Sequence, residues 1–368
     1  MSIKVVTVVG ARPQFIKAAA VSRAIRNDHS RRIHEVIVHT GQHFDDNMSK
    51  VFFEELEIPA PDYDLEISGG AHGEMTGRML ERLERVLIDE APDWVLVYGD
   101  TNTTLAGALA AVKLHQPVAH VEAGLRSFNR RMPEEINRIV ADRVSTVLFC
   151  PTETAVTNLR NEGIEAGVHR CGDVMFDVSL FYRDRARERS KVLTTLGLEQ
   201  ERFALATCHR AENTDDRRRL EAILAALQRI SKDLAVVLPL HPRTRKMIDQ
   251  FTLTSLLDGV RVIEPQPYLD MIALEQAAAL ILTDSGGVQK EAFFFDVPCV
   301  TLREETEWVE TVNAGANVLV GADADRIIAA VKSAPDERRA SRPQPYGNGR
   351  AARCIVDVLT RSGKSNGH

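Results

Sequence analysis

The chain has 368 residues, enough for two domains, and its 44% hydrophobic content is typical of a globular protein rather than a disordered or fibrous one. Lysine and arginine number 46 against 52 aspartate and glutamate residues, a net charge of −6 that excludes a general nucleic-acid-binding protein. Aromatic residues make up 5% of the chain, which also disfavours base stacking.

The spacing of the cysteines and the length of the apolar runs together predict the cellular compartment of the protein. The five cysteines are scattered, odd in number and form no C-x-x-C pair: Cys150, Cys171, Cys208, Cys299 and Cys354. This pattern favours buried thiols in a reducing compartment over disulfides or a zinc site. The first apolar run is as short as a strand, and none approaches the roughly 20 residues of a membrane span. We therefore expect a cytoplasmic protein with no membrane or metal association.

Short runs of Val, Ile and Leu alternate along the whole chain with helix-length segments, which is typical of βαβ units on parallel sheets. In the first half, strands are predicted at 4–9, 35–39, 94–97, 118–121 and 146–149, and helices at 16–25, 47–56, 73–89, 103–114 and 134–142. In the second half, strands are predicted at 204–207, 236–239, 260–263, 280–283 and 299–302, and helices at 218–230, 242–251, 268–276, 288–295 and 324–332.

The fold class is therefore α/β, with two doubly wound, Rossmann-like domains in tandem. After a short strand at 167–170 we place the boundary so that the domains span 1–172 and 173–349, and a last helix at about 350–361 packs back on the first. The charged segment 183–191 is expected to be a solvated helix surface. Two such sheets would face a central cleft, and ligands of parallel sheets bind where strands end.

The first strand is followed by Gly10-Ala11-Arg12-Pro13-Gln14-Phe15-Ile16-Lys17. A glycine turn entering a helix offers amides and a helix dipole to an anion, and Arg12 and Lys17 add two cations. The segment is neither a P-loop nor G-x-G-x-x-G, so it argues against Walker-type and dinucleotide binding. A plain strand–helix turn with solvated charges is the alternative.

Three acids follow later predicted strands or open a helix: Asp100, Glu122 and Glu134. Asp100 has a structural alternative as a helix N-cap, and Glu134 or its neighbour Glu135 as an ordinary first-turn acid. A glutamate at an apolar strand end is unfavourable unless it is paired or functional. Because a parallel sheet would bring these loops to one edge, we expect the acids to converge, raise one another's pKa and suit proton abstraction and return.

The second half of the chain carries a different set of candidate functional residues. His209 and His241 follow successive strands, which favours function over the structural role usual for a single histidine. Ser285, Gly286 and Gly287 open a helix after a strand and are typical of a diphosphate site. Glu291 lies one turn further, where a carboxylate can accept both hydroxyls of a ribose, although a structural strand–turn–helix is the alternative.

Taken together, these segments resemble the non-hydrolysing UDP-N-acetylglucosamine 2-epimerases, which have the two-domain glycosyltransferase-B fold. The matching stretches occur in order over about 300 residues: 10–17 (GARPQFIK), 41–43 (GQH), 99–104 (GDTNTT), 120–126 (HVEAGLR), 133–138 (PEEINR), 208–213 (CHRAEN), 240–244 (LHPRT) and 283–291 (TDSGGVQKE). A single motif of this kind would be a weak signal, whereas eight in the family order are a strong one.

The resemblance implies a reaction in which UDP is eliminated across C1–C2 of the sugar, leaving 2-acetamidoglucal, and then re-adds while C2 is protonated on the other face. It implies no metal and no nicotinamide cofactor. It also implies roles for individual residues: Asp100, Glu122, Glu134 and His209 as catalytic residues, and Arg12, Lys17, His241, Met271, Ser285, Gly286, Gly287 and Glu291 as substrate-binding residues, with Met271 near the uracil.

Two segments depart from the family pattern. Many members read TERPE where this chain has Thr306-Glu307-Trp308-Val309-Glu310, so Trp308 replaces an arginine near the nucleotide-sugar site. The related 2-epimerases of O-antigen synthesis, which act on UDP-2,3-diacetamido-2,3-dideoxyglucuronate, are similar in this segment. Their activity is therefore the alternative function for this chain. Gln42 and His43 match only partly the segment that holds an activating second UDP-N-acetylglucosamine in some bacterial members.

Further alternatives are a glycosyltransferase of the same fold and a catalytically silent nucleotide-sugar sensor. The chain shows no amphipathic stretch that would suit an acceptor or a membrane partner, and the clustered acids favour proton transfer. The family resemblance implies a homodimer whose partner is a UDP-sugar rather than nucleic acid or membrane.

Overall fold

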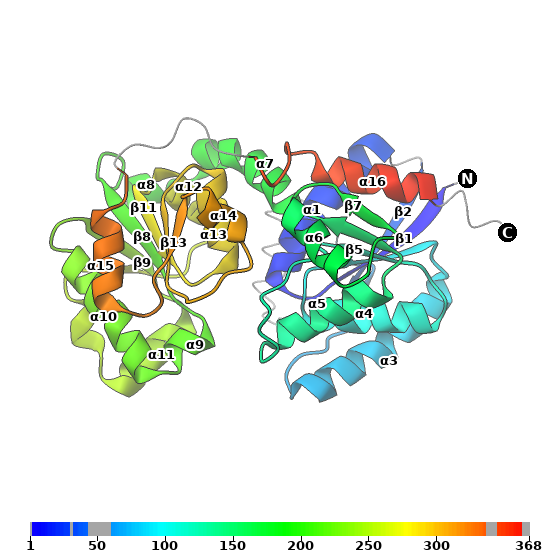
Figure 1. Ribbon diagram of the computed structural model, residues 1–368, viewed down its shortest axis with the longest axis horizontal. Helices are drawn as coiled ribbons and strands as arrows, with labels where there is room; N and C mark the ends of the chain where they lie inside the picture. Colours follow the sequence, from blue (N-terminus) through cyan, green and yellow to red (C-terminus); the bar gives the residue numbers. More distant parts are fainter. Residues whose placement is uncertain (1, 30–31, 43–59, 336–343, 363–368) are drawn as a thin grey trace. The chain divides into compact units, whose positions relative to one another are not determined.

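The computed structural model describes the chain except for residues 1, 30–31, 43–59, 336–343 and 363–368. The chain divides into two compact units (Figure 1). Unit 1 comprises Met1–Val178 and Gln344–His368, and unit 2 comprises Ser179–Pro343. The division lies a few residues after the boundary expected at 172, and the returning C-terminal segment belongs to unit 1. No helix among the described residues is long and apolar enough to cross a membrane.

Unit 1 is built on a parallel sheet with strand order β3-β2-β1-β4-β5-β6-β7. Its strands are β1 (Ile3–Val9), β2 (Ile33–His39), β3 (Tyr63–Asp64), β4 (Trp94–Tyr98), β5 (Val118–Val121), β6 (Val147–Cys150) and β7 (Val168–Arg170). The central strands are buried on both faces, which explains their continuous Val, Ile and Leu runs. Since all pairings are parallel, the loops that follow the strands lie at one edge.

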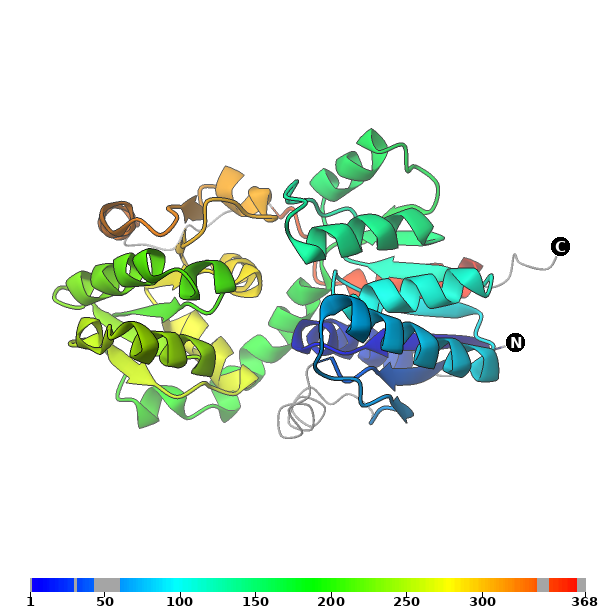
Figure 2. The same ribbon diagram turned by 90° about the horizontal axis from the view of Figure 1, so that it is seen from below.

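Helices cover both faces of the unit 1 sheet. They are α1 (Arg12–Ala24), the π-helical turn η1 (Ile25–His29), α3 (His72–Glu90), α4 (Asn102–Lys113), α5 (Pro133–Val144), α6 (Glu153–Asn161) and α16 (Ala351–Ser362), while α7 (Val174–Arg189) begins in unit 1 and continues into unit 2. Helices α3 and α4 lie side by side (blue to cyan in Figure 2). Val6 and Val8 of β1 pack in one core with Met79 and Leu83 of α3 and the alanine face of α4. Gly107 lets α4 approach the sheet, because a Cβ there would lie 3.0 Å from Val97 Cγ1.

Unit 2 is a second parallel sheet, with strand order β10-β9-β8-β11-β12-β13. Its strands are β8 (Phe203–Thr207), β9 (Ala235–Pro239), β10 (Arg261–Ile263), β11 (Leu280–Thr283), β12 (Cys299–Thr301) and β13 (Asn317–Leu319). Its helices are α8 (Val192–Thr195), α9 (Ala211–Thr214), α10 (Arg217–Ile230), α11 (Pro242–Phe251), the 3₁₀ turn η2 (Thr254–Leu257), α12 (Tyr268–Ala277), α13 (Gly286–Phe294), α14 (Val309–Asn313) and α15 (Ala324–Lys332). The apolar face of α10 is buried against the sheet together with Ile248 of α11 and Ile327 of α15.

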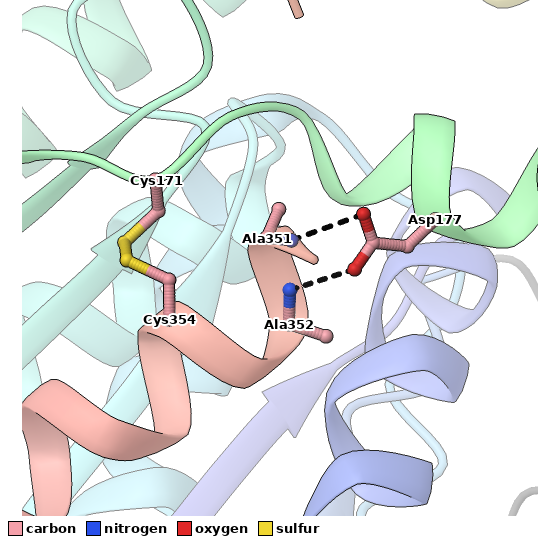
Figure 3. The surroundings of a disulfide bond; sticks show 5 residues. All are labelled: Cys171, Asp177, Ala351, Ala352 and Cys354. Carbon is pink, nitrogen blue, oxygen red and sulfur yellow. Dashed lines mark hydrogen bonds between the residues drawn. A yellow bond between two sulfur atoms is a disulfide. The ribbon is translucent and has the colours of Figure 1, made fainter. Parts of the chain in front are cut away.

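The last helix, α16, packs against α1 of unit 1. Cys354 of α16 forms a disulfide with Cys171, which follows β7, across a Cα–Cα distance of 5.6 Å (Figure 3). The expectation that all five cysteines are free thiols was therefore wrong for this pair. Cys150, Cys208 and Cys299 are free and buried, as expected. The sequence did not predict this pairing because 183 residues separate the two cysteines. Only the return of the chain to unit 1 brings them together.

Candidate active site

The turn after β1 is held to β4 by Gln14, a buried side chain that sequence reasoning passed over. Its Oε1 accepts hydrogen bonds from the amides of Gly10 and Ala11 at 2.9 and 3.0 Å, and its Nε2 donates to the carbonyl of Tyr98 at 2.9 Å. Two of the amides expected to bind an anion are thus already engaged. Arg12 is the first residue of α1, and its side chain lies outside the described part of the structure.

Lys17 and Glu122 form an ion pair at this edge of unit 1, and each side chain is only 8% exposed. The pair lies next to Gly99: a Cβ there would be 3.1 Å from Lys17 Nζ and 3.5 Å from Glu122 Oε1. Glu122 has a backbone φ of +73°, in the left-handed region that non-glycine residues rarely adopt. Such residues cluster at functional sites, so this conformation agrees with a functional reading of Glu122.

Asp100 is paired with Arg138 of α5, and Arg138 also contacts Glu135. The alternative of Asp100 as a helix cap is not realised, because Thr101 is the N-cap of α4 and its hydroxyl accepts from the amide of Thr104. The carboxylate of Asp100 remains 29% exposed. The acids were expected to repel one another, but Asp100 and Glu122 each lie beside a cation.

Burial separates the two neighbouring acids of α5. Glu135 is 1% exposed, and its carboxylate accepts from the amides of Ser127 at 3.0 Å and Phe128 at 2.9 Å, so it is structural. Glu134 is partly exposed and lies one turn before Arg138, the partner of Asp100. The structure thus gathers Asp100, Glu122 and the first turn of α5 at one edge of the sheet.

Gln42 follows β2, and its side chain contacts the start of α4. Its Oε1 accepts from the amide of Thr103 at 3.0 Å and from the hydroxyl of Thr103 at 2.8 Å. His43 lies outside the described residues. A role for this segment in binding an activating nucleotide sugar stays a prediction.

In unit 2, the loop that carries His209 is fixed by Asp284, a fully buried carboxylate that sequence reasoning did not single out. Asp284 accepts from the amides of His209 and Arg210 at 3.0 Å and from Asn213 Nδ2 at 3.1 Å. The imidazole of His209 is 40% exposed, with its Nδ1 3.8 Å from Asp284, beyond hydrogen-bonding distance. Asp284 therefore positions the backbone beside His209.

The rings of His209 and His241 lie 5.7 Å apart, so the two strand-end histidines are neighbours. His241 is the N-cap of α11, and its Nδ1 accepts from the amide of Arg243 at 3.2 Å. A ring nitrogen that accepts carries no proton, so Nδ1 is the unprotonated nitrogen of His241 in this arrangement.

Ser285, Gly286 and Gly287 form the turn into α13, and their role in binding a diphosphate stays a prediction. Ser285 is the N-cap, and a Cβ at Gly287 would meet nothing nearer than Ser285 Oγ at 3.8 Å. The first amides of a helix have no acceptor within it, and together with the helix dipole they favour an anion. We call residues 285–287 the cradle.

Trp308 borders this cradle. A Cβ at Gly286 would lie 3.2 Å from Trp308 Nε1 and 3.8 Å from a guanidinium nitrogen of Arg210. Lys290 Nζ lies 3.8 Å from the centre of the Trp308 ring, a cation–π contact, and both side chains are buried. The residue that departs from the family pattern therefore lines the place where a phosphate would bind.

Glu291 is 6% exposed on α13 and accepts from the hydroxyl of Tyr268 at 3.2 Å. Tyr268 begins α12, and Met271 lies in the first turn of the same helix and is partly exposed. The predicted ribose and uracil residues thus belong to two helices that touch. Tyr268 was not predicted, because an apolar helix start gives no sign of a hydrogen bond to a distant carboxylate.

Comparisons with known proteins identify the family. The family model described as UDP-N-acetylglucosamine 2-epimerase matches residues 24–360. A UDP-2,3-diacetamido-2,3-dideoxy-D-glucuronate 2-epimerase of Pseudomonas aeruginosa is 56% identical over 97% of this chain and 99% of its own length. A UDP-N-acetylglucosamine 2-epimerase of Methanocaldococcus jannaschii is 45% identical over 97% of this chain and 99% of its own.

A crystal structure of the Methanocaldococcus jannaschii UDP-GlcNAc 2-epimerase in complex with UDP-GlcNAc and UDP matches with a TM-score of 0.90 and 44% identity, covering 98% of this chain and 100% of that one. The fold is thus the glycosyltransferase-B-like arrangement of two parallel sheets, and the predicted resemblance is confirmed. The chain belongs to the UDP-N-acetylglucosamine 2-epimerase family, whose members are isomerases.

Proposed function

We propose that this protein is a non-hydrolysing UDP-N-acetylglucosamine 2-epimerase that interconverts UDP-GlcNAc and UDP-ManNAc. The observation that carries the proposal is the buried Lys17–Glu122 pair beside Gly99–Asp100, at the edge of unit 1 where three strand-end loops meet. A carboxylate at a strand end beside a lysine and a second acid provides the proton donors and acceptors that an epimerisation needs.

The two units have different proposed roles. Unit 1 supplies Asp100, Glu122 and Glu134 for proton transfer, with Arg12 and Lys17 as cations for the substrate. Unit 2 binds UDP: the cradle takes the diphosphate, Glu291 the ribose hydroxyls and Met271 the uracil, while His209 acts in catalysis and His241 contacts the substrate. The space beside Gly287 and the near-buried carboxylate of Glu291 support this division.

The proposed reaction has two halves. First, the proton at C2 passes to a carboxylate while the C1–O bond breaks with its electron pair going to UDP, which leaves 2-acetamidoglucal. Second, a phosphate oxygen of UDP adds back to C1, and C2 takes a proton on the opposite face. We assign the proton transfers to the three acids as a group rather than to individual carboxylates. No redox step is involved, since departure of UDP is what makes the C2 proton removable.

A second candidate substrate is UDP-2,3-diacetamido-2,3-dideoxyglucuronate. It is favoured by the 56% identity to the Pseudomonas aeruginosa enzyme of that name, against 45% for the Methanocaldococcus jannaschii UDP-GlcNAc enzyme. Trp308 at the cradle is a further reason, because it alters the wall of the phosphate site.

The experiment is to measure kcat/KM for both UDP-sugars without any acceptor, following the anomeric protons by NMR. Formation of the manno epimer from UDP-GlcNAc with the higher kcat/KM supports the proposal. A higher kcat/KM for the diacetamido-uronate identifies the second candidate. No epimer from either sugar would contradict both and favour a glycosyltransferase.

We further propose, from the family resemblance, that the protein is a cytoplasmic homodimer. Light scattering of the purified protein over a range of concentrations tests the dimer, and a monomer mass at all concentrations would contradict it. Fractionation of the source cells tests the location.

A further inference from the structure

A buried pair of ionisable groups lies beneath the acid-bearing edge of unit 1. His120, in β5, and Asp142, in α5, are 0% and 1% exposed. His120 Nδ1 lies 2.7 Å from Asp142 Oδ1, and its Nε2 lies 2.7 Å from the carbonyl oxygen of Gly99. Neither residue has a role in the reaction proposed above.

The partners of this pair define its protonation. A carbonyl oxygen can only accept, so His120 Nε2 carries a proton. Burial by itself raises the pKa of Asp142, but the hydrogen bond and charge of His120 and the charge of Arg126 outweigh it and hold this pKa below its usual range. The hydrogen bond between His120 and Asp142 therefore links β5 directly to α5.

The second oxygen of Asp142 completes the network. Its Oδ2 accepts from the amide of Gly124 at 3.1 Å and from Arg126 Nη1 at 2.7 Å. Arg126 in turn donates to both carboxylate oxygens of Glu162, at 2.7 and 2.8 Å. Arg126 thus lies between two carboxylates, and such pairing is what allows a buried charge to be tolerated.

This network touches every segment that carries a candidate acid. Gly99 immediately precedes Asp100 and has a φ of +63°. Glu122, at φ +73°, lies between His120 and Gly124, both held by the network. Asp142 is part of α5, the helix whose first turn contains Glu134. A left-handed glutamate persists only where its surroundings over-determine it, and this network provides that constraint.

We propose that His120 and Asp142 are positioning residues for the epimerase reaction, forming a buried, hydrogen-bonded histidine–carboxylate pair that holds the three acid-bearing segments in place relative to one another. This inference rests on the proposed function for its kinetic test but not for its spectroscopic one. Neither residue touches the substrate; each acts through the backbone of Gly99 and Gly124.

The kinetic test uses His120→Gln and Asp142→Asn. Each keeps a polar side chain in place but changes the groups that form the hydrogen bond between the two residues. We expect kcat to fall about 100-fold, as for a misplacement of about 1 Å, with little change in KM. We also expect more turnovers to end in free UDP and 2-acetamidoglucal, because re-addition needs the acids in place a second time. Both products are quantified by NMR.

Asp177→Asn is the matched control. Asp177 is another carboxylate of unit 1 that accepts two backbone amides, but those amides belong to α16. It is expected to change stability while leaving kcat and glycal release at the wild-type values. Folded His120→Gln and Asp142→Asn variants with wild-type kcat and glycal release would overturn the proposal.

The spectroscopic test uses the wild-type protein labelled with ¹⁵N-histidine, so it stands whether or not the variants are active. The His120 signal is assigned by its loss in His120→Gln, or in His120→Asn if the first variant does not fold. Nε2 is expected to show the shift of a protonated nitrogen at neutral pH, because it donates to the carbonyl of Gly99. An Nε2 without a proton would overturn the contact on which the proposal rests, even if epimerase activity is established; failure of the proposed function would instead appear as no turnover by the wild-type enzyme.

Discussion

Neighbouring residues of one chemical type have different roles here, and their surroundings separate them. The sequence could place Glu134 and Glu135 in a helix start but could not distinguish them, since both positions favour acids. Burial and three hydrogen bonds to residues 127–128 mark Glu135 as structural. Gln14, Asp284 and Asp142 were missed for the same reason: their importance lies in contacts with residues far along the chain.

The substitution Asp100→Asn tests the catalytic group. It keeps the size of the side chain but removes the charge that pairs with Arg138. Turnover is expected to fall at least about 100-fold, the usual contribution of a general acid or base. The Kd for UDP, measured by titration calorimetry, is expected to stay within error because UDP is assigned to unit 2. Turnover near the wild-type rate would remove Asp100 from the mechanism.

Trp308→Phe tests the wall of the cradle. The substitution keeps a ring for Lys290 to stack on but removes the Nε1–H group that lies beside Gly286. If this group donates to the diphosphate, its loss should raise the Kd for UDP about tenfold, as for a hydrogen bond to a charged acceptor. Trp308→Ala is the companion variant, in which the ring is lost as well. An unchanged Kd in Trp308→Phe would mean that the indole serves packing alone.

At the scale of elements, the sequence predicted the regular pattern well and the short pieces poorly. Strands β5 and β11 and helices α11 and α15 have the predicted bounds, because apolar runs and helix caps define them. The helix predicted at 47–56 lies outside the described residues. Missed were β3, β13, α6, α8, α9 and α14, most of which have five residues or fewer and lack a full hydrophobic period. The charged segment 183–191 belongs mostly to α7, which begins earlier, at Val174.

The start of α16 gives a pH-dependent prediction. The carboxylate of Asp177 accepts from the amides of Ala351 and Ala352, at 3.1 and 2.8 Å (Figure 3). Burial raises the pKa of Asp177 from 3.8 to about 6. A raised pKa for an acid means that the fold favours its protonated form. The stability it contributes is present below pH 4 and is lost as the pH rises through 6, by about 3 kcal/mol in total.

The check compares Tm of wild type and Asp177→Asn between pH 4 and 7. The variant does not titrate at this position, so the wild-type Tm should decline relative to it as the pH rises. A Tm difference that stays constant, or that grows in favour of wild type, would contradict the assignment.

At the scale of the whole molecule, the disulfide joins Cys171, shortly before the chain passes into unit 2, to Cys354 in the last helix, α16, after the chain has returned to unit 1. It closes a loop that contains all of unit 2, with a sequence separation of 183 residues. Chain entropy assigns up to about 5 kcal/mol to the closing of so long a loop. The tandem α/β plan followed from alternating apolar runs, but this link depends on where the chain returns, which local patterns do not encode.

Reduction should therefore lower the thermal stability of unit 1. The measurement is Tm with and without dithiothreitol. This reagent reduces the protein disulfide to two thiols by thiol–disulfide exchange and is itself oxidised to its cyclic disulfide. The double variant Cys171→Ser/Cys354→Ser should have a lower Tm that no longer responds to the reductant. A wild-type Tm that is indifferent to reduction would show that the link adds no stability.

The central claim is that the acids at the edge of unit 1 break and remake the C2–H bond of a UDP-sugar. The most direct measurement is incubation of the enzyme with UDP-GlcNAc in deuterated water, without acceptor, followed by proton NMR. The account predicts a manno epimer that carries deuterium at C2, with exchange lost in Asp100→Asn. An epimer that retains its original C2 proton, or no product from UDP-GlcNAc or its diacetamido-uronate analogue, would contradict it.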